Sequence, residues 1–120
     1  TCTREMIEDL CKAVPMMKKV LEGQTGILNL TADSPKEILP TNIQLFRLYI
    51  SYYLQTHQDV NPALDIIVTQ KEATAYGLPL EIYFFTKEKA WAIHENKQSD
   101  IFDHIMAMAH EFGIRLYQRP

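Results

Sequence analysis

The densest group of ionisable side chains lies near the C-terminal end of the chain. Asp100, Asp103 and His104 share one short segment, and His110 and Glu111 follow a few residues later. Asp100 and His104 stand four apart, which on a helix suits either an ion pair or two ligands of a metal ion. One helix offers two such ligands at most, and no HExxH motif or second cluster supplies the others. We therefore expect a salt bridge, solvated or at an interface, and no metal site.

The sequence carries no recognisable pairing of a nucleophile with a base. Cys11 with His57 or His94 is one conceivable pair, but no local sequence signature accompanies it. Cys11 lies on an apolar stripe, where packing is the simpler role. Glycine-rich phosphate loops, GxSxG motifs and paired-carboxylate motifs are all missing from the sequence. We expect no catalytic residue, no enzymatic activity and no cofactor.

Length and composition fit one compact soluble domain. The chain has 120 residues, of which 47% are hydrophobic and 22% charged. A net charge of -3 lacks the positive field that nucleic acids require, so we exclude them as partners. Cys2 and Cys11 form no disulfide or zinc framework, which fits a reducing compartment. No uncharged apolar run approaches the ~20 residues of a membrane helix. The chain does not begin with methionine, so we expect a piece of a longer protein.

Residues 1–40 are predicted to form a helical insertion followed by a connector. Apolar residues recur at helical spacing from Thr3 onward, which predicts an amphipathic helix. Pro15 should break this helix and open a second short one, which runs to about Leu21 and ends at Gly23. Turn residues dominate the stretch 24–40, within which residues 27–30 are the one candidate for a short strand.

A helix over residues 42–56 is predicted to be apolar on two sides. Thr41 and Gln44 have the spacing of a capping box, which marks its start. A surface helix of a small monomer usually carries a single apolar stripe. The second stripe is therefore covered either by the segment that follows Pro15 or by a neighbouring subunit, and the sequence favours neither.

Two strands, a helix and a closing strand should follow. Residues 64–70 and 80–86 are predicted to pair as a long-looped hairpin, because they are rich in β-branched and apolar residues. A helix begins near Lys87 and ends at Gly113, and residues 114–117 form the last strand. Trp91, the sole tryptophan, is expected to anchor the core or a domain edge, or less often to be an interface hot spot.

This order of elements predicts an α+β fold. A strand ahead of helix 42–56 would complete the split β-α-β arrangement of a two-layer, ferredoxin-like domain over residues 41–120. That strand is either missing or supplied by residues 27–30. If it is missing, the sheet has an open edge that another chain can occupy.

An ordered set of short motifs runs from Thr41 to Gln118. In chain order they are Thr41-Asn42, Phe46-Arg47 with Tyr49, Gly77-Leu78-Pro79, Glu81-Ile82-Tyr83, Phe85-Thr86, Trp91, Asp100-Ile101-Phe102-Asp103-His104 and Glu111-Phe112-Gly113. This set resembles the C-terminal cytoplasmic domain of MscS-like mechanosensitive ion channels, above all the miniconductance branch. That branch carries an insertion ahead of Thr41-Asn42, to which the first helical segment is more loosely similar.

The resemblance implies a parent embedded in the bacterial inner membrane and assembled as a homo-oligomeric ring, commonly a heptamer. The cytoplasmic domains of such channels enclose a vestibule with side portals through which ions and small solutes pass. This chain would then be a soluble domain on the cytoplasmic side of that membrane. It would supply vestibule walls and subunit contacts for tension-gated ion efflux in osmotic protection.

Six residues are the expected subunit-interface or structural positions under this resemblance. They are Arg47, Tyr49, Trp91, Asp100, Asp103 and His104. The chain departs from the family at Thr69, where arginine is common, and at His94, where tyrosine is common. No specific salt bridge between subunits is therefore expected at either position.

Two other classes of function remain open from the sequence. The first is a soluble, ferredoxin-like regulatory module that binds a small ligand at a subunit interface, because this fold hosts many unrelated functions. The second is an enzyme, for which the Asp100 and His104 pair would be the place to look. The absence of a motif ranks the enzyme third.

Overall fold

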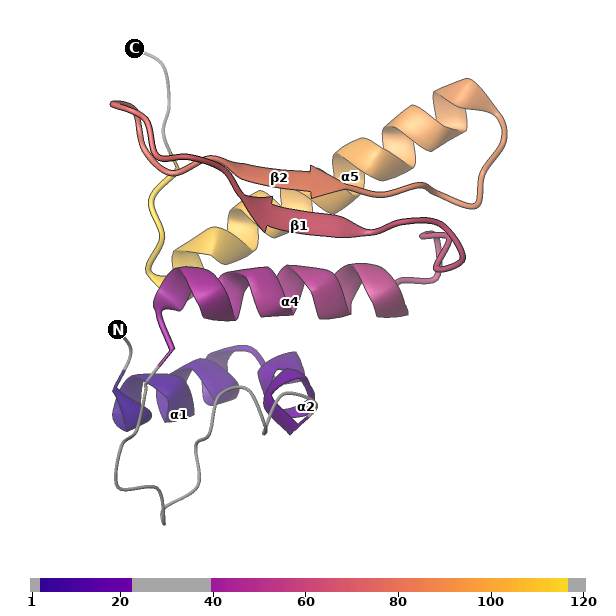
Figure 1. Ribbon diagram of the computed structural model, residues 1–120. Helices are drawn as coiled ribbons and strands as arrows, with labels where there is room; N and C mark the ends of the chain where they lie inside the picture. Colours follow the sequence, from indigo (N-terminus) through magenta and orange to yellow (C-terminus); the bar gives the residue numbers. More distant parts are fainter. Residues whose placement is uncertain (1–2, 23–39, 117–120) are drawn as a thin grey trace.

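The computed structural model describes residues 3–22 and 40–116 (Figure 1). These residues form α1 (Arg4–Ala13), α2 (Met16–Glu22), α4 (Asn42–Thr56), β1 (Ile67–Gln70), β2 (Leu80–Tyr83), α5 (Trp91–Ala109) and the 3-10 turn η1 (His110–Phe112). Four α-helices and a two-stranded antiparallel sheet make up the described residues, which confirms the α+β class. The candidate strand at residues 27–30 and the helix end at Gly23 lie outside them.

The first two helices form as the sequence predicts, with a break at Pro15. The Thr3 hydroxyl accepts a hydrogen bond from the Met6 N–H at 3.2 Å and so caps the start of α1. Val14 still donates its N–H to the Leu10 carbonyl at 2.8 Å, after which Pro15 turns the chain into α2. The buried side chains of the two helices, Ile7, Leu10, Met17 and Val20, belong to one core with α4.

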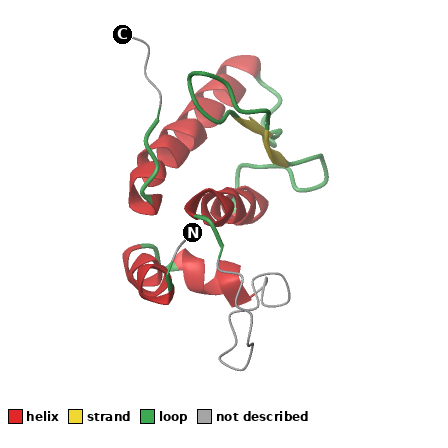
Figure 2. Ribbon diagram, turned by 60° about the vertical axis from the view of Figure 1, so that its left-hand side comes forward, coloured by secondary structure: helices red, strands yellow, loops and turns green. Residues whose placement is uncertain are grey.

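α4 lies at the centre of the molecule and is covered on two sides. The Thr41 hydroxyl accepts the Gln44 N–H at 3.1 Å, and the helix has the bounds that the sequence predicts. α1 and α2 lie against one side of α4, and β1 and α5 against the other (Figures 1 and 2). The segment that follows Pro15 therefore covers the second apolar stripe from within the same chain.

The sheet is a hairpin of two short antiparallel strands. Ile67 pairs with Tyr83 at one end and Gln70 with Leu80 at the other. Residues 64–66 are not in the strand, because Asn61 begins a turn in which its side-chain oxygen accepts the Ala63 N–H at 3.0 Å. The turn at the far end passes through Gly77, whose φ of 136° suits glycine.

After Tyr83 the chain leaves β1 and pairs with a different segment. The Phe85 carbonyl accepts the Asn61 N–H at 2.8 Å, and Thr86 forms an isolated bridge with Val60. The predicted second strand, residues 80–86, therefore ends early because its last residues have changed partner. The two strand pairings together bring the loop after α4 beside the loop before α5.

The end of α5 confirms the role of Gly113 but not the predicted closing strand. Gly113 has a left-handed φ of 69°, and the Ile114 N–H donates to the Ala109 carbonyl at 3.0 Å, as in a Schellman motif. Residues 114–116 form no strand, and residue 117 lies outside the described part. The prediction was wrong for 114–116, because the Ile114 N–H closes the helix instead of pairing with the sheet.

One core joins the layers. Met17 of α2, Leu45 and Ile50 of α4 and Ile101 of α5 are each at most 2% exposed. Phe84, which follows β2, packs its ring 5.5 Å from that of Phe102 on α5. Within residues 3–22 and 40–116, no helix combines the length and the apolar character needed to cross a membrane.

Candidate functional site

Tyr49, Tyr53 and His104 form a compact cluster between α4 and α5, which we call the Tyr–His cluster. The Tyr49 hydroxyl lies 2.7 Å from His104 Nε2. The Tyr53 ring stacks on the His104 ring, with centroids 4.4 Å apart and an interplanar angle of 20°. Phe112 packs against Tyr49 at 5.4 Å, and His57 meets the Tyr53 ring edge-on at 5.2 Å. Two of the six predicted positions, Tyr49 and His104, are thus brought together.

The electrostatics of this cluster keep its groups neutral. Burial raises the pKa of Tyr49 to about 12, with a smaller contribution from Tyr53. Burial lowers the pKa of His104 below its ordinary value, and nearby His57 lowers it further. At neutral pH a neutral phenol and a neutral imidazole therefore share this hydrogen bond, and the tautomer of His104 sets which of the two donates. Such a neutral, buried hydrogen bond ties α4 to α5.

The ion pair predicted between Asp100 and His104 is not formed. The His104 ring turns toward α4 and its two tyrosines, while Asp100 and Asp103 lie on the exposed side of α5. Neither aspartate has a hydrogen bond or ion pair within the described ranges. Those ranges also hold no group of three or more histidine, cysteine or acidic side chains placed to bind a metal ion.

Arg47 is half-buried on α4, and its Nε atom is buried without a hydrogen-bond partner. An unpaired buried donor costs about 1–3 kcal/mol, so an unpartnered guanidinium nitrogen is unusual in a finished interface or core. Arg47 Nε is therefore a buried polar atom that the described residues leave without a hydrogen bond.

Trp91 begins α5 and is not a core anchor. Its side chain is 71% exposed, and the centroid of its ring lies 5.6 Å from that of the His94 ring. A tryptophan this exposed leaves a large apolar surface in water, which is typical of a contact surface rather than of packing.

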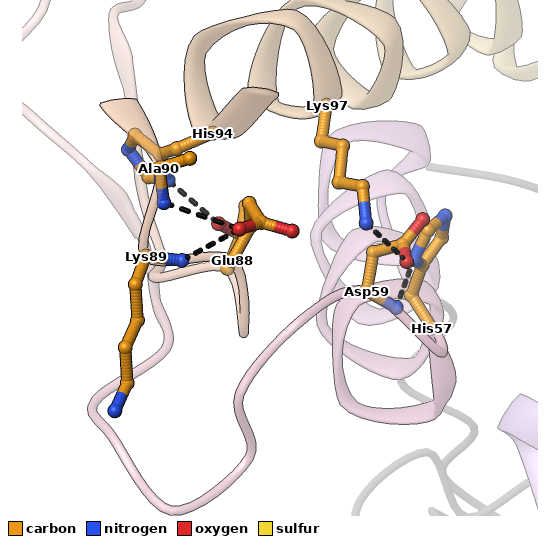
Figure 3. Close-up of polar contacts among 8 residues, drawn as sticks. His57, Asp59, Glu88, Lys89, Ala90, His94 and Lys97 are labelled. Atoms are coloured by element: carbon orange, nitrogen blue, oxygen red, sulfur yellow. Dashed lines mark hydrogen bonds and ion pairs between the residues drawn. The ribbon is translucent and has the colours of Figure 1, made fainter. Parts of the chain in front are cut away.

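Two separate groups of polar contacts lie near the start of α5, and we call them together the loop junction (Figure 3). Lys97 Nζ lies 3.2 Å from Asp59 Oδ1, and the Asp59 N–H donates to His57 Nδ1 at 3.0 Å. Glu88 Oε1 accepts the N–H groups of Lys89 and Ala90, both at 3.1 Å. The loop junction thereby fixes the start of α5, from which Trp91 projects.

A further contact at this place involves His94, one of the two positions where the chain differs from the family that it resembles in sequence. The Thr86 hydroxyl lies 2.6 Å from His94 Nδ1, and Thr86 is only 8% exposed. His94 thus has a structural partner within the chain. Sequence reasoning missed the loop junction because Asp59 and Lys97 are 38 positions apart, and only Glu88, just ahead of a helix start, carries a local signal.

No known family model matches the sequence, and no solved structure matches the chain with significance. The resemblance to mechanosensitive channels therefore stays a prediction, and the site has to be interpreted from its own geometry.

Besides that of Met6, large apolar side chains are exposed in two parts of the fold. One part comprises the hairpin turn, the C-terminal half of α5 and the tail that follows, and the other comprises β2, the loops and the start of α5. The first set is Tyr76, Leu78, Met106 and Leu116, and the second is Leu64, Tyr83, Phe85, Trp91 and Ile93. Contiguous exposed apolar surface marks contact or ligand sites more often than single scattered residues do.

Proposed function

We propose that this chain is the cytoplasmic domain of an MscS-like mechanosensitive channel and provides subunit contacts and vestibule wall in a homo-oligomeric ring. The observation that carries the proposal is Trp91, 71% exposed on a helix start that the loop junction holds in place. A fixed, exposed indole costs little ordering entropy when a partner covers it, which is why tryptophan dominates interface hot spots.

Charged groups on α4 and α5 add support for contacts between copies. Arg47 has a buried Nε without a partner, whereas Asp100 and Asp103 are exposed and unpaired among the described residues. In a ring, the arginine of one subunit and a carboxylate of the next are chemically complementary, and a guanidinium binds a carboxylate in a bidentate manner. The ordered motifs from Thr41 to Gln118 are the reason for choosing this family.

In this proposal the chain lies on the cytoplasmic side of the membrane and encloses the vestibule that permeant ions and small solutes cross. Gating by membrane tension belongs to other parts of the parent. The Tyr–His cluster then has a purely structural task, because its neutral hydrogen bond holds together the two helices that carry Arg47 and the aspartates.

The proposal is tested on the full-length parent. Its gene is expected to encode several apolar segments of about 20 residues ahead of Thr1. Reconstituted in liposomes under patch-clamp suction, the parent should give tension-gated currents. A parent without such segments, or one that stays silent under tension up to membrane rupture, would overturn the proposal.

A regulatory module that binds a small ligand is the second candidate function. The observation that favours it is a cavity of about 390 Å³ beside the hairpin turn. A ligand that binds only the folded chain would raise its melting temperature by linkage. A metabolite screen that gives no shift would count against this candidate.

A further inference from the structure

The cavity beside the hairpin turn is built from segments that are far apart in the sequence. Its walls come from the start of α4, the hairpin turn and β2, the second half of α5, and residues 114–116. Figure 1 shows the hairpin turn on the same side of the molecule as the end of the described chain. Its volume of about 390 Å³ lies within the range of small-molecule sites.

The floor of this cavity is apolar, and its rim is apolar and exposed. Phe46 and Ile105 on the floor are 3% and 2% exposed. Four side chains at the rim leave much of their surface in water: Tyr76 is 70% exposed, Met106 47%, Leu116 46% and Leu78 44%. An apolar ligand chain placed here would remove both kinds of surface from water, which drives its binding.

Among the described residues that line the cavity, Arg115 is the only one with a formal charge at neutral pH. It also lines an adjoining, more open cavity of about 680 Å³, together with His110. Arg115 thus lies where the apolar cavity meets a more open space. Within residues 3–22 and 40–116 no hydrogen bond or ion pair engages the Arg115 side chain.

The Thr74 hydroxyl at the turn is already in use. The Thr74 hydroxyl donates to the Gly77 carbonyl and accepts the Tyr76 N–H, each at 3.2 Å. It has little capacity left for a ligand head group. Arg115 supplies the charge at the mouth, and its planar guanidinium is suited to a carboxylate.

From this arrangement we infer that the cavity binds a free, medium-chain monocarboxylate. The apolar chain lies between α5 and the hairpin turn, and the carboxylate pairs with Arg115 at the mouth. The inference names the ligand class for the second candidate function and rests on that candidate, not on the ring. A neutral amphiphile lacks the charge pair, and a cationic one is repelled.

The first experiment compares three head groups on one chain. Octanoate, octanol and octylammonium are each titrated into the 120-residue chain below their micelle-forming concentrations. Calorimetry should give one saturable site for octanoate, with affinity about tenfold or more above that of octanol. NMR methyl signals of Leu78, Ile105 and Met106 should shift. Equal binding of all three compounds, or no saturable binding of octanoate, would overturn the inference.

The second experiment reverses the charge at the mouth. Arg115→Glu should lower octanoate affinity by about tenfold or more and make octylammonium the better ligand. Lys89→Glu is the matched control, because it makes the same charge change on an exposed side chain outside the cavity and should leave octanoate binding unchanged. Melting curves by circular dichroism confirm that each variant is folded.

Two outcomes separate the ligand class from the other proposals. A thermal shift with another metabolite and none with octanoate would overturn the carboxylate ligand while the second candidate function survived. Sedimentation that shows a stable dimer, which octanoate neither binds nor dissociates, would also overturn it. Both measurements use the chain itself, so their results do not depend on channel currents.

Discussion

The Tyr–His cluster and the start of α5 differ in the exposure of their aromatic side chains. In the cluster, Tyr49 is 3% exposed, and its hydroxyl is paired with His104 of the same chain. At the start of α5, Trp91 is 71% exposed, although the loop junction behind it is well bonded. The comparison separates residues that hold this fold together from residues that are held in place by it. The four changes below should affect stability in decreasing order if this distinction is right.

The largest effect is expected for Tyr49→Ala. The substitution empties a buried site that packs on Phe112 and removes the partner of His104, so it should lower the free energy of unfolding by about 3 kcal/mol or more. Tyr49→Phe keeps the ring and should cost about 1–2 kcal/mol. Urea denaturation followed by circular dichroism measures both. A loss below about 1 kcal/mol for the alanine variant would contradict the assignment of Tyr49 to the residues that hold the fold together.

A pH-dependent effect of intermediate size should come from His104. Burial lowers its pKa in the folded chain below the ordinary 6.5, so the unfolded chain binds the proton more readily. The contribution of His104 to stability is therefore complete above pH 6.5 and declines as the pH falls from 6.5 through the lowered pKa. His104→Gln should lose this part of the pH dependence. The same slope in both proteins would show that another group is responsible.

A smaller change is expected for the ion pair of the loop junction. Asp59 and Lys97 are 31% and 35% exposed, so solvent screens their attraction. Lys97→Met should lower the free energy of unfolding by about 1 kcal/mol or less. Lys71→Met, which removes the more exposed pair with Glu81, is the control with a smaller expected loss. A loss above about 2 kcal/mol would mean that this ion pair contributes as much to stability as a core contact does.

Trp91→Ala should change stability least and association most. The free energy of unfolding should stay within about 0.5 kcal/mol, because the side chain is exposed. We expect the chain alone to associate weakly at high concentration, since ring contacts act together, and we expect the variant to associate less. Light scattering measures both. A stable heptamer of the unchanged chain, or equal association of the two proteins, would contradict this assignment.

The sequence predicts those parts of the fold that local chemistry determines. Thr41 marks the start of α4, Pro15 separates α1 from α2, and Gly113 ends the helical region, because each acts through its immediate neighbours. The pairing of the hairpin is also confirmed. The strand ends and the segment 114–116 were wrong because they depend on which distant backbone groups are free to pair.

The contacts of the candidate site were predicted less well than the fold, for the same reason. Spacing alone joins Asp100 to His104, since the two lie four apart in the sequence. The real partner of His104 is Tyr49, which is 55 positions away and comes near only when α4 and α5 pack. Trp91 was more readily expected to anchor the core or a domain edge than to lie at an interface, because nothing in the sequence tells an anchored indole from an exposed one.

The exposure of Trp91 also determines what an optical experiment on this protein can report. Trp91 is the only tryptophan, and 71% of its surface is already in water when the chain is folded. Unfolding should therefore barely move the wavelength of its emission. A blue shift on concentration, or on adding a partner, would instead record that the indole has been covered.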